Sequence, residues 1–176
     1  MSYIIGRGRY AREAYPSPAG GSGSGPLLQT QFANVPDGQN PSTTSGTYVD
    51  LLPVTVNITT GANPLIIDAT ASAQLGPANE GDPLVESTID YRVTIDGVPL
   101  PGSGFSSLFP PADPAPAAPQ SGGVVIKTAP LAAGAHVVVL QWRCGGVESG
   151  SNRASIDPTT ANGGEHASLL VEEVSS

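Results

Sequence analysis

Cysteine, tryptophan, charged side chains and long apolar runs are all scarce in this 176-residue sequence. The single cysteine, Cys144, excludes an internal disulfide framework and fits folding in a reducing compartment. We interpret it as a small residue at a strand end, because no neighbour in the sequence would lower its pKa and make it a nucleophile. No apolar run approaches the ~20 residues that span a membrane, and the N-terminal arginines lack the apolar run of a signal peptide. We therefore expect a soluble, unprocessed protein made in a cytoplasm.

Signatures of catalysis and metal binding are absent as well. The two histidines, His136 and His166, have no accompanying cluster of cysteines, histidines and carboxylates, so we expect no metal site. No glycine-rich loop precedes a helix, which excludes a phosphate cradle. The acidic residues are scattered along polar strand faces, and a glycosidase-like pair of carboxylates is the least favoured hypothesis. We expect no enzyme activity and no cofactor.

The net charge of −8 is unevenly distributed along the chain. Three of the seven basic residues, Arg7, Arg9 and Arg12, precede the first acidic residue, Glu13. The rest of the chain is therefore more acidic than the total indicates, which argues against nucleic-acid binding. Arginines of this kind more often meet carboxylates on a protein partner than phosphates.

Residues 1–46 are predicted to form an extended N-terminal arm. Pro16–Pro26 is rich in glycine, serine and proline, as in a linker, and Leu27–Phe32 fits one short strand. Such a segment cannot bury enough apolar area to fold alone, so it is either a disordered tail or a docking arm that orders on a partner. We favour the docking arm, because tyrosine and arginine are typical of interface hot spots. The predicted docking residues are Tyr3, Arg7, Arg9, Tyr10, Arg12 and Tyr15.

Residues 47–176 are predicted to form a domain built only of strands. The clearest pattern places Val85, Ser87, Ile89, Tyr91, Val93 and Ile95 on one face, with polar residues alternating between them. Asp96-Gly97 is a strong signal for a hairpin turn. Similar alternation occurs in the segments 54–58 and 65–73, and further strands are predicted at 124–129, 153–156 and 166–174. No stretch has helical periodicity over three turns.

The segment Leu131–Cys144 is predicted to be the central strand. His136, Val138, Leu140 and Trp142 share one face of it. Both faces are apolar between Val137 and Leu140, which predicts a strand covered on both sides. Trp142 is interpreted as a core residue, with an exposed platform for a sugar as the alternative.

A long irregular loop is predicted over Pro101–Gly123, since five prolines between residues 110 and 119 disfavour helix and central strand. Phe105, Leu108 and Phe109 are expected to cover an open end of the domain or to contact a neighbouring subunit.

Seven or eight strands in this length predict an all-β fold, namely an antiparallel two-sheet jelly-roll sandwich with an extended N-terminal arm. An immunoglobulin-like sandwich is the alternative, although it needs fewer strands and the chain lacks its Cys…Trp…Cys pattern.

Two stretches, Leu131–Arg143 and His166–Glu173, resemble the late strands of small jelly-roll domains in tailed-phage virion and fibre proteins. Those domains are similar to the heads of the complement and tumour-necrosis-factor group. The opening Ile5–Pro16 resembles the start of small phage structural proteins. The resemblance implies a virion structural protein without catalytic residues. It also implies that a homotrimer could form, which the sequence itself does not indicate.

We therefore expect a capsid decoration or minor head protein, localised in the virion and bound through its arm to the major capsid protein or to neck or tail subunits. The alternatives are a neck or tail fibre, or a module that binds a host glycan through Trp142 or the 101–123 loop. We expect neither nucleic acid nor membrane among its partners.

Overall fold

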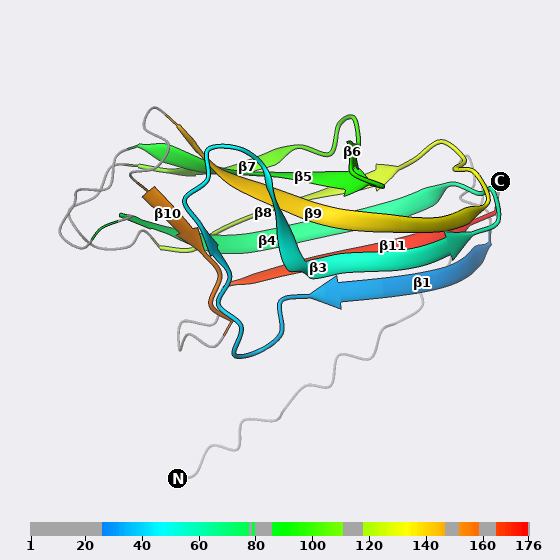
Figure 1. The fold of residues 1–176 in the computed structure, drawn as a ribbon, viewed down its shortest axis with the longest axis horizontal. Helices are drawn as coiled ribbons and strands as arrows, with labels where there is room; N and C mark the ends of the chain where they lie inside the picture. The colour runs from blue at the N-terminus through cyan, green and yellow to red at the C-terminus, as the bar shows by residue number, and fades with distance from the viewer. Residues whose placement is uncertain are drawn as a thin grey trace, which may run out of the picture.

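The computed structural model describes residues 26–77, 79, 86–110, 118–146, 152–158 and 165–175. Among these residues there is no helix, and the strands form two antiparallel sheets that pack face to face (Figure 1). No described segment is a helix long and apolar enough to cross a membrane. The predicted all-β sandwich is confirmed.

The strands divide between two sheets. Sheet 1 contains β1 (Leu27–Asn34), β2 (Ser42–Thr43), β4 (Leu65–Pro77), β8 (Gln120–Lys127), β10 (Asn152–Ser155) and β11 (His166–Val174). Sheet 2 contains β3 (Val49–Thr60), β5 (Ser87–Ile95), β6 (Val98–Pro99), β7 (Phe105–Phe109) and β9 (Gly134–Gly146).

The pairing of the long strands is nested, so that strands far apart in the sequence are neighbours. β1 pairs with β11, β3 with β9, β4 with β8, and β5 with β7. Because β11 also pairs with β4 and β9 with β5, the long strands have the orders β1-β11-β4-β8 and β3-β9-β5-β7. A long antiparallel hairpin wrapped into two sheets gives this order, which is that of a jelly roll rather than an immunoglobulin-like sandwich.

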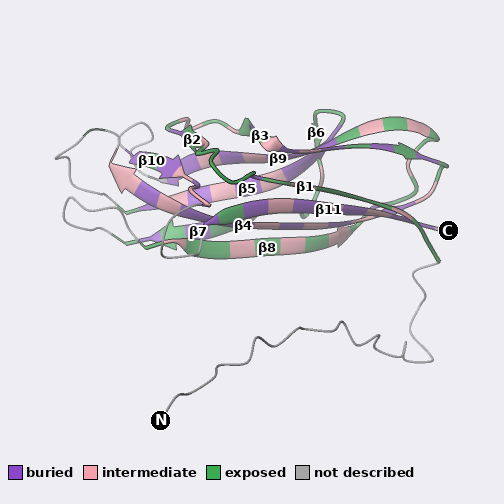
Figure 2. Cartoon of the chain, turned by 90° about the horizontal axis from the view of Figure 1, so that it is seen from below, coloured by how far each residue is buried: buried purple, intermediate pink, exposed green. Residues whose placement is uncertain are grey.

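The core lies between the sheets and is formed by alternate residues of each strand, as the banded colouring in Figure 2 shows. On β4 the inward set is fully buried and includes Leu65, Ile67 and Leu75. On β5 the inward residues Ile89, Tyr91 and Val93 are buried as predicted. Alternation thus places the apolar residues inside because side chains of a strand point to opposite faces in turn.

The predicted hairpin turn at Asp96-Gly97 is confirmed. Asp96 has a φ of 52° and Gly97 a φ of 78°, the positive values that a tight two-residue turn between antiparallel strands requires. The turn leads into β6, which pairs with β5.

The prediction for Pro101–Gly123 was wrong over Phe105–Phe109, which form β7 at the edge of sheet 2, and over Gln120–Gly123, which begin β8. Phe109 is fully buried and Phe105 stacks on Tyr91 with a centroid distance of 4.8 Å, whereas Leu108 is exposed. The alternation of five residues was hidden by the prolines that follow it, and β5 supplies the pairing that stabilises it.

β9 is the central strand predicted from the sequence, with β3 on one side and β5 on the other. Its inward residues Val138, Leu140, Trp142 and Cys144 are buried. The expected cover on both faces is wrong at Val137, which is 40% exposed, because its side chain lies on the outer face of sheet 2.

Residues 27–46, which the sequence assigned to the arm, contribute β1 and β2 to sheet 1. The strand expected at Leu27–Phe32 is confirmed and extends to Asn34. The following residue, Val35, is buried in the core, and its N–H donates to the carbonyl of Ala167 at 3.0 Å. The sandwich therefore begins well before residue 47, and only residues before 26 are left for the arm.

Candidate interaction surfaces

The predicted docking residues precede the described part of the chain. Tyr3, Arg7, Arg9, Tyr10, Arg12 and Tyr15 all lie outside the described residues. What the structure does describe is the point from which they depart. Pro26 accepts a hydrogen bond from the N–H of Ser175 at 3.0 Å, so the start of β1 is fixed beside the end of β11.

β1 is the edge strand of sheet 1 and is exposed along most of its length. Leu27, Leu28 and Phe32 are large apolar residues that remain open to solvent. Phe32 lies opposite Leu170 on the outer face of the sheet. Exposed apolar residues concentrated on an edge strand indicate a contact surface more strongly than single ones elsewhere.

β1 is tied to the sandwich by Glu173 of β11. Its carboxylate accepts hydrogen bonds from the N–H of Gly61 (2.7 Å), from Nδ2 of Asn63 (2.9 Å) and from Nε2 of Gln29 (2.5 Å). These three donors lower the pKa of Glu173, the backbone N–H of Gly61 most of all. The same Gln29 Nε2 also lies 2.5 Å from the carbonyl of Thr59, so one glutamine joins both sheets at this edge.

A polar cluster lies on the outer face of sheet 2, where Tyr48 meets two arginines. The guanidinium carbons of Arg92 and Arg143 lie 4.0 Å and 4.7 Å from the centre of the Tyr48 ring. Arg143 donates from Nε and Nη2 to the same oxygen of Asp90, both at 2.9 Å. Such pairs of cation and aromatic ring contribute about 0.5–1 kcal/mol each at exposed sites.

The cluster continues through Gln141 toward β3. Arg92 Nε donates to Gln141 Oε1 at 2.8 Å, and Gln141 Nε2 donates to Asp50 Oδ1 at 2.6 Å. Arg143 pairs with Asp90, and Arg92 is linked through Gln141 to Asp50. Two carboxylates therefore balance the charge of the two arginines. The cluster therefore links β3, β9 and β5 by side-chain contacts across the strands, and it is not an open site for an anion.

A cleft of about 340 Å³ opens beside Asp50, at the rim formed by β2 and the start of β3. Polar groups of Gln39, Ser42 and Asp50 line it together with the apolar Val49 and Leu52. Trp142 contributes to its wall but is only 2% exposed, so the interpretation as a core residue is confirmed. The alternative of an exposed aromatic platform at Trp142 is wrong.

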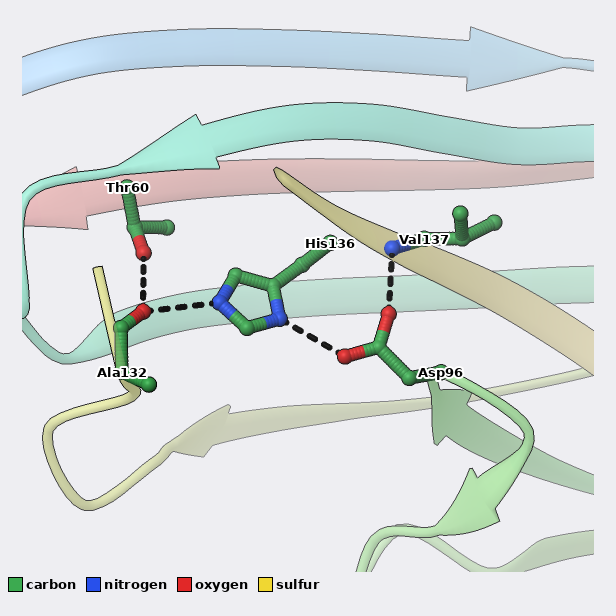
Figure 3. Close-up of polar contacts among 5 residues, drawn as sticks. All are labelled: Thr60, Asp96, Ala132, His136 and Val137. Carbon is green, nitrogen blue, oxygen red and sulfur yellow. Dashed lines mark hydrogen bonds and ion pairs between the residues drawn. The ribbon is translucent and has the colours of Figure 1, made fainter. Parts of the chain in front are cut away.

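His136 forms a compact polar arrangement with Asp96 and the carbonyl of Ala132 (Figure 3). Its Nδ1 lies 2.7 Å from Oδ2 of Asp96, and its Nε2 lies 2.9 Å from the carbonyl oxygen of Ala132. The other oxygen of Asp96 accepts the N–H of Val137 at 2.8 Å, and Thr60 donates to the same carbonyl of Ala132 at 3.0 Å.

Both ring nitrogens of His136 therefore face acceptors, which favours the imidazolium. The Ala132 carbonyl, followed by Asp96, raises the pKa of His136, and the hydrogen bond from His136 lowers the pKa of Asp96. A general base needs a free nitrogen within reach of a substrate proton. Because both ring nitrogens of His136 are engaged, neither is free to accept a proton from a substrate. The contacts of His136 instead link the β5–β6 turn to the segment before β9.

We expect the stability of the protein to depend on pH through this pair. A raised pKa of His136 means that its contribution is fully present below 6.5 and is lost as the pH rises through the folded pKa. The free energy of unfolding of wild type should therefore exceed that of His136→Gln by more at pH 6 than at pH 9. Urea titrations at both pH values measure this. Asp96→Asn keeps an acceptor for Val137 and leaves the larger effect of the Ala132 carbonyl, so it should reduce the pH dependence only in part. Equal differences at the two pH values would contradict the assignment.

Cys144 is buried on the inner face of β9 and its Sγ donates to the carbonyl of Thr43 at 3.2 Å. Burial raises the pKa of its thiol, so the thiolate that nucleophilic chemistry needs is disfavoured. Within the described ranges, no group of three or more histidines, cysteines and carboxylates is arranged to hold a metal ion.

Two features of these surfaces have no equivalent in the sequence-based prediction. The alternation on β5 placed Asp90 and Arg92 on a polar face, but their partners Arg143 and Gln141 follow from the register with β9. The exposed edge of β1 was hidden because the segment was assigned to the arm.

No protein-family model matches the chain, and a search of curated proteins finds no match either. The surfaces above are therefore interpreted from their own chemistry.

Proposed function

We propose that this protein is a non-enzymatic structural component of a phage particle. Its jelly roll projects from the particle surface, and its N-terminal segment attaches it to a neighbouring subunit. The observation that carries the proposal is the position of β1. In the sequence the Tyr/Arg-rich segment is followed by the Pro16–Pro26 stretch and then by an exposed edge strand, and the carbonyl of Pro26 accepts the N–H of Ser175. The segment can therefore dock on a partner without any rearrangement of the core.

Charge supports a partner that is a protein with exposed carboxylates. Arg7, Arg9 and Arg12 carry three positive charges in an otherwise acidic chain. Arginine binds carboxylates with two parallel hydrogen bonds, and a tyrosine adds apolar area beside them. A segment that orders on docking gives up conformational entropy, which limits its affinity but lets it cover a wide surface.

Deletion of residues 1–25 tests the proposal. We expect the truncated protein to be lost from purified particles almost completely, while its fold, followed by circular dichroism, is retained. Occupancy is measured by quantitative gel analysis of particles assembled with each variant. Replacement of Gly20–Gly25 by another glycine/serine sequence of the same length is the matched control and should leave occupancy unchanged. Unchanged occupancy after the deletion would refute the docking role.

We favour a decoration or minor head protein over a neck or tail fibre, because the chain is short and has no fibrous repeat. Electron microscopy of particles that carry a labelled copy separates the two positions. Label confined to the neck or tail would assign the alternative.

A host-glycan binding module is the second candidate, supported by the cleft beside Asp50. Carboxylate, amide and hydroxyl groups beside apolar walls are the groups that bind sugar hydroxyls and ring faces. A glycan array probed with the full chain and with Asp50→Ala tests this role. Binding that Asp50→Ala abolishes would support it, and absence of binding would leave the structural role alone.

A further inference from the structure

The two sheets have edges of very different character. The edge at β3 is interrupted between Asp50 and Thr55, where the register shifts and Pro53 lies. The edge at β8 contains Gly122, Gly123 and Lys127, and the opposite edge of sheet 2 consists of the short strands β6, with Pro99, and β7. Prolines, lysines, bulges and short strands are the features by which proteins prevent their edges from pairing.

β1 has little of this protection. Its eight residues, Leu-Leu-Gln-Thr-Gln-Phe-Ala-Asn, include no charge, no proline and no glycine. The one irregularity lies at its start, between Leu27 and Gln29. The straight part of the strand, from Gln29 to Asn34, keeps a continuous register with β11.

The backbone of β1 presents unused pairing groups on its outer side. Val35 N–H donates inward, to Ala167 of the β11 side. Since the groups of an antiparallel strand point alternately to either side, those of Thr30, Phe32 and Asn34 point away from β11. In the part of the chain that the structure describes, β1 pairs with β11 alone.

Apolar surface accompanies these groups. Phe32 is 61% exposed, and Figure 2, which looks onto this edge, shows β1 running along the open side of the sandwich. Phe32 and Leu170 lie side by side on the outer face of sheet 1. A partner strand beside β1 would cover the ring of Phe32. It would also form hydrogen bonds with the outward N–H and C=O groups of β1.

We propose that β1 pairs antiparallel with β1 of a second copy of this chain, about a two-fold axis at Phe32. This register places Phe32 opposite its counterpart and Thr30 opposite Asn34, so the three outward residues of each strand meet and form about six hydrogen bonds. Charge favours this edge for a contact between copies. Each copy carries a net charge of −8, and the contact occurs along a strand that has no charged residue.

The pairing joins two copies of sheet 1 into one continuous sheet and directs the two N-terminal segments apart. Ten residues separate one Leu27 from the other along the paired strands, or about 34 Å at ~3.4 Å per residue. If the segments dock as proposed above, one dimer engages two neighbouring subunits and gains affinity from the linkage. The dimer itself does not depend on that docking role.

Disulfide trapping in the full chain tests the pairing. Residues directly opposite in a hydrogen-bonded antiparallel pair have Cα atoms about 5.5 Å apart, which a disulfide can bridge. In a Cys144→Ala background we expect Phe32→Cys to form a covalent dimer under mild oxidation at least ~10-fold more completely than Leu108→Cys. Leu108 is the matched control, because it is 62% exposed, as Phe32 is, but lies on β7. Equal cross-linking of the two variants, or none, would overturn the proposal.

Sedimentation equilibrium supplies the second measurement. An interface formed by one strand pair is small, so we expect a weak dimer in a dilution series from ~1 mM to ~1 µM. Phe32→Lys should raise the dissociation constant at least ~10-fold, and Leu108→Lys should leave it unchanged. A wild-type chain that is monomeric throughout the series, or a dimer that Phe32→Lys does not weaken, would show that β1 pairs with its own arm, with another protein or with nothing.

Discussion

Trp142→Ala will lower the free energy of unfolding by about 3–5 kcal/mol, the usual cost of removing a buried tryptophan. The indole is 2% exposed and lies on the inner face of β9, opposite Tyr91 of the paired strand β5. Neighbouring residues cannot fully close the resulting cavity, because β9 and β5 are held by hydrogen bonds to strands on both sides. Since small domains are stable by only about 5–15 kcal/mol, this one change removes a large share of the total.

Urea unfolding followed by circular dichroism measures the effect, because the substitution removes the only tryptophan fluorophore. Trp142→Phe keeps most of the volume and should cost clearly less. Leu52→Ala is the control, since Leu52 is 76% exposed and its truncation should change stability by no more than ~0.5 kcal/mol. A loss below about 1 kcal/mol for Trp142→Ala would mean that the indole does not fill the core.

The same experiment bears on glycan binding. If Trp142 stacked on a sugar, its substitution would reduce binding and leave stability nearly unchanged. Burial of the ring predicts the reverse, with a large loss of stability. A glycan contact at this cleft would therefore use its polar rim, where Asp50 and Gln39 lie.

The parts of the fold that were predictable are those in which one face is buried. β5 alternates apolar and polar residues from Thr88 to Ile95, and burial follows the alternation as far as Val93. In β11 burial alternates from Ala167 to Glu172, although the residue types alternate less strictly. The Asp96-Gly97 turn was predictable because positive φ angles restrict the choice of residues. The number of strands favoured a jelly roll, but the nested pairing itself is seen only in the structure.

The parts that were missed depend on partners far away in the sequence. Gln29 donates to the carboxylate of Glu173, 144 residues later, and the residues near Gln29 in the sequence do not indicate that contact. A strand was predicted at Leu27–Phe32, but β1 is exposed on most positions, so no alternation indicated that it belongs to the sandwich rather than to the arm. β7 is short and flanked by prolines, and only its pairing with β5 makes it a strand. The register between β9 and β5, which assembles the cluster around Tyr48, is likewise a tertiary property.

Truncation at the two candidate boundaries should give opposite results. A chain starting at Pro26 keeps β1, and we expect its thermal unfolding midpoint to match that of the full chain within a few degrees. A chain starting at Thr47 lacks β1, Val35 and β2, and we expect it to lose its cooperative transition or to be insoluble.

Several losses add up in the shorter chain. Burial of Val35 alone contributes about 1.5–3 kcal/mol. The removal of Gln29 takes one hydrogen-bond donor from Glu173, and β11 becomes an edge with unpaired N–H and C=O groups. Together these losses are a large share of the about 5–15 kcal/mol by which a typical domain is stable. Thermal unfolding of both chains, followed by circular dichroism, measures these effects. A chain from Thr47 that unfolds cooperatively at the full-length midpoint would show that β1 belongs to the arm and not to the sandwich.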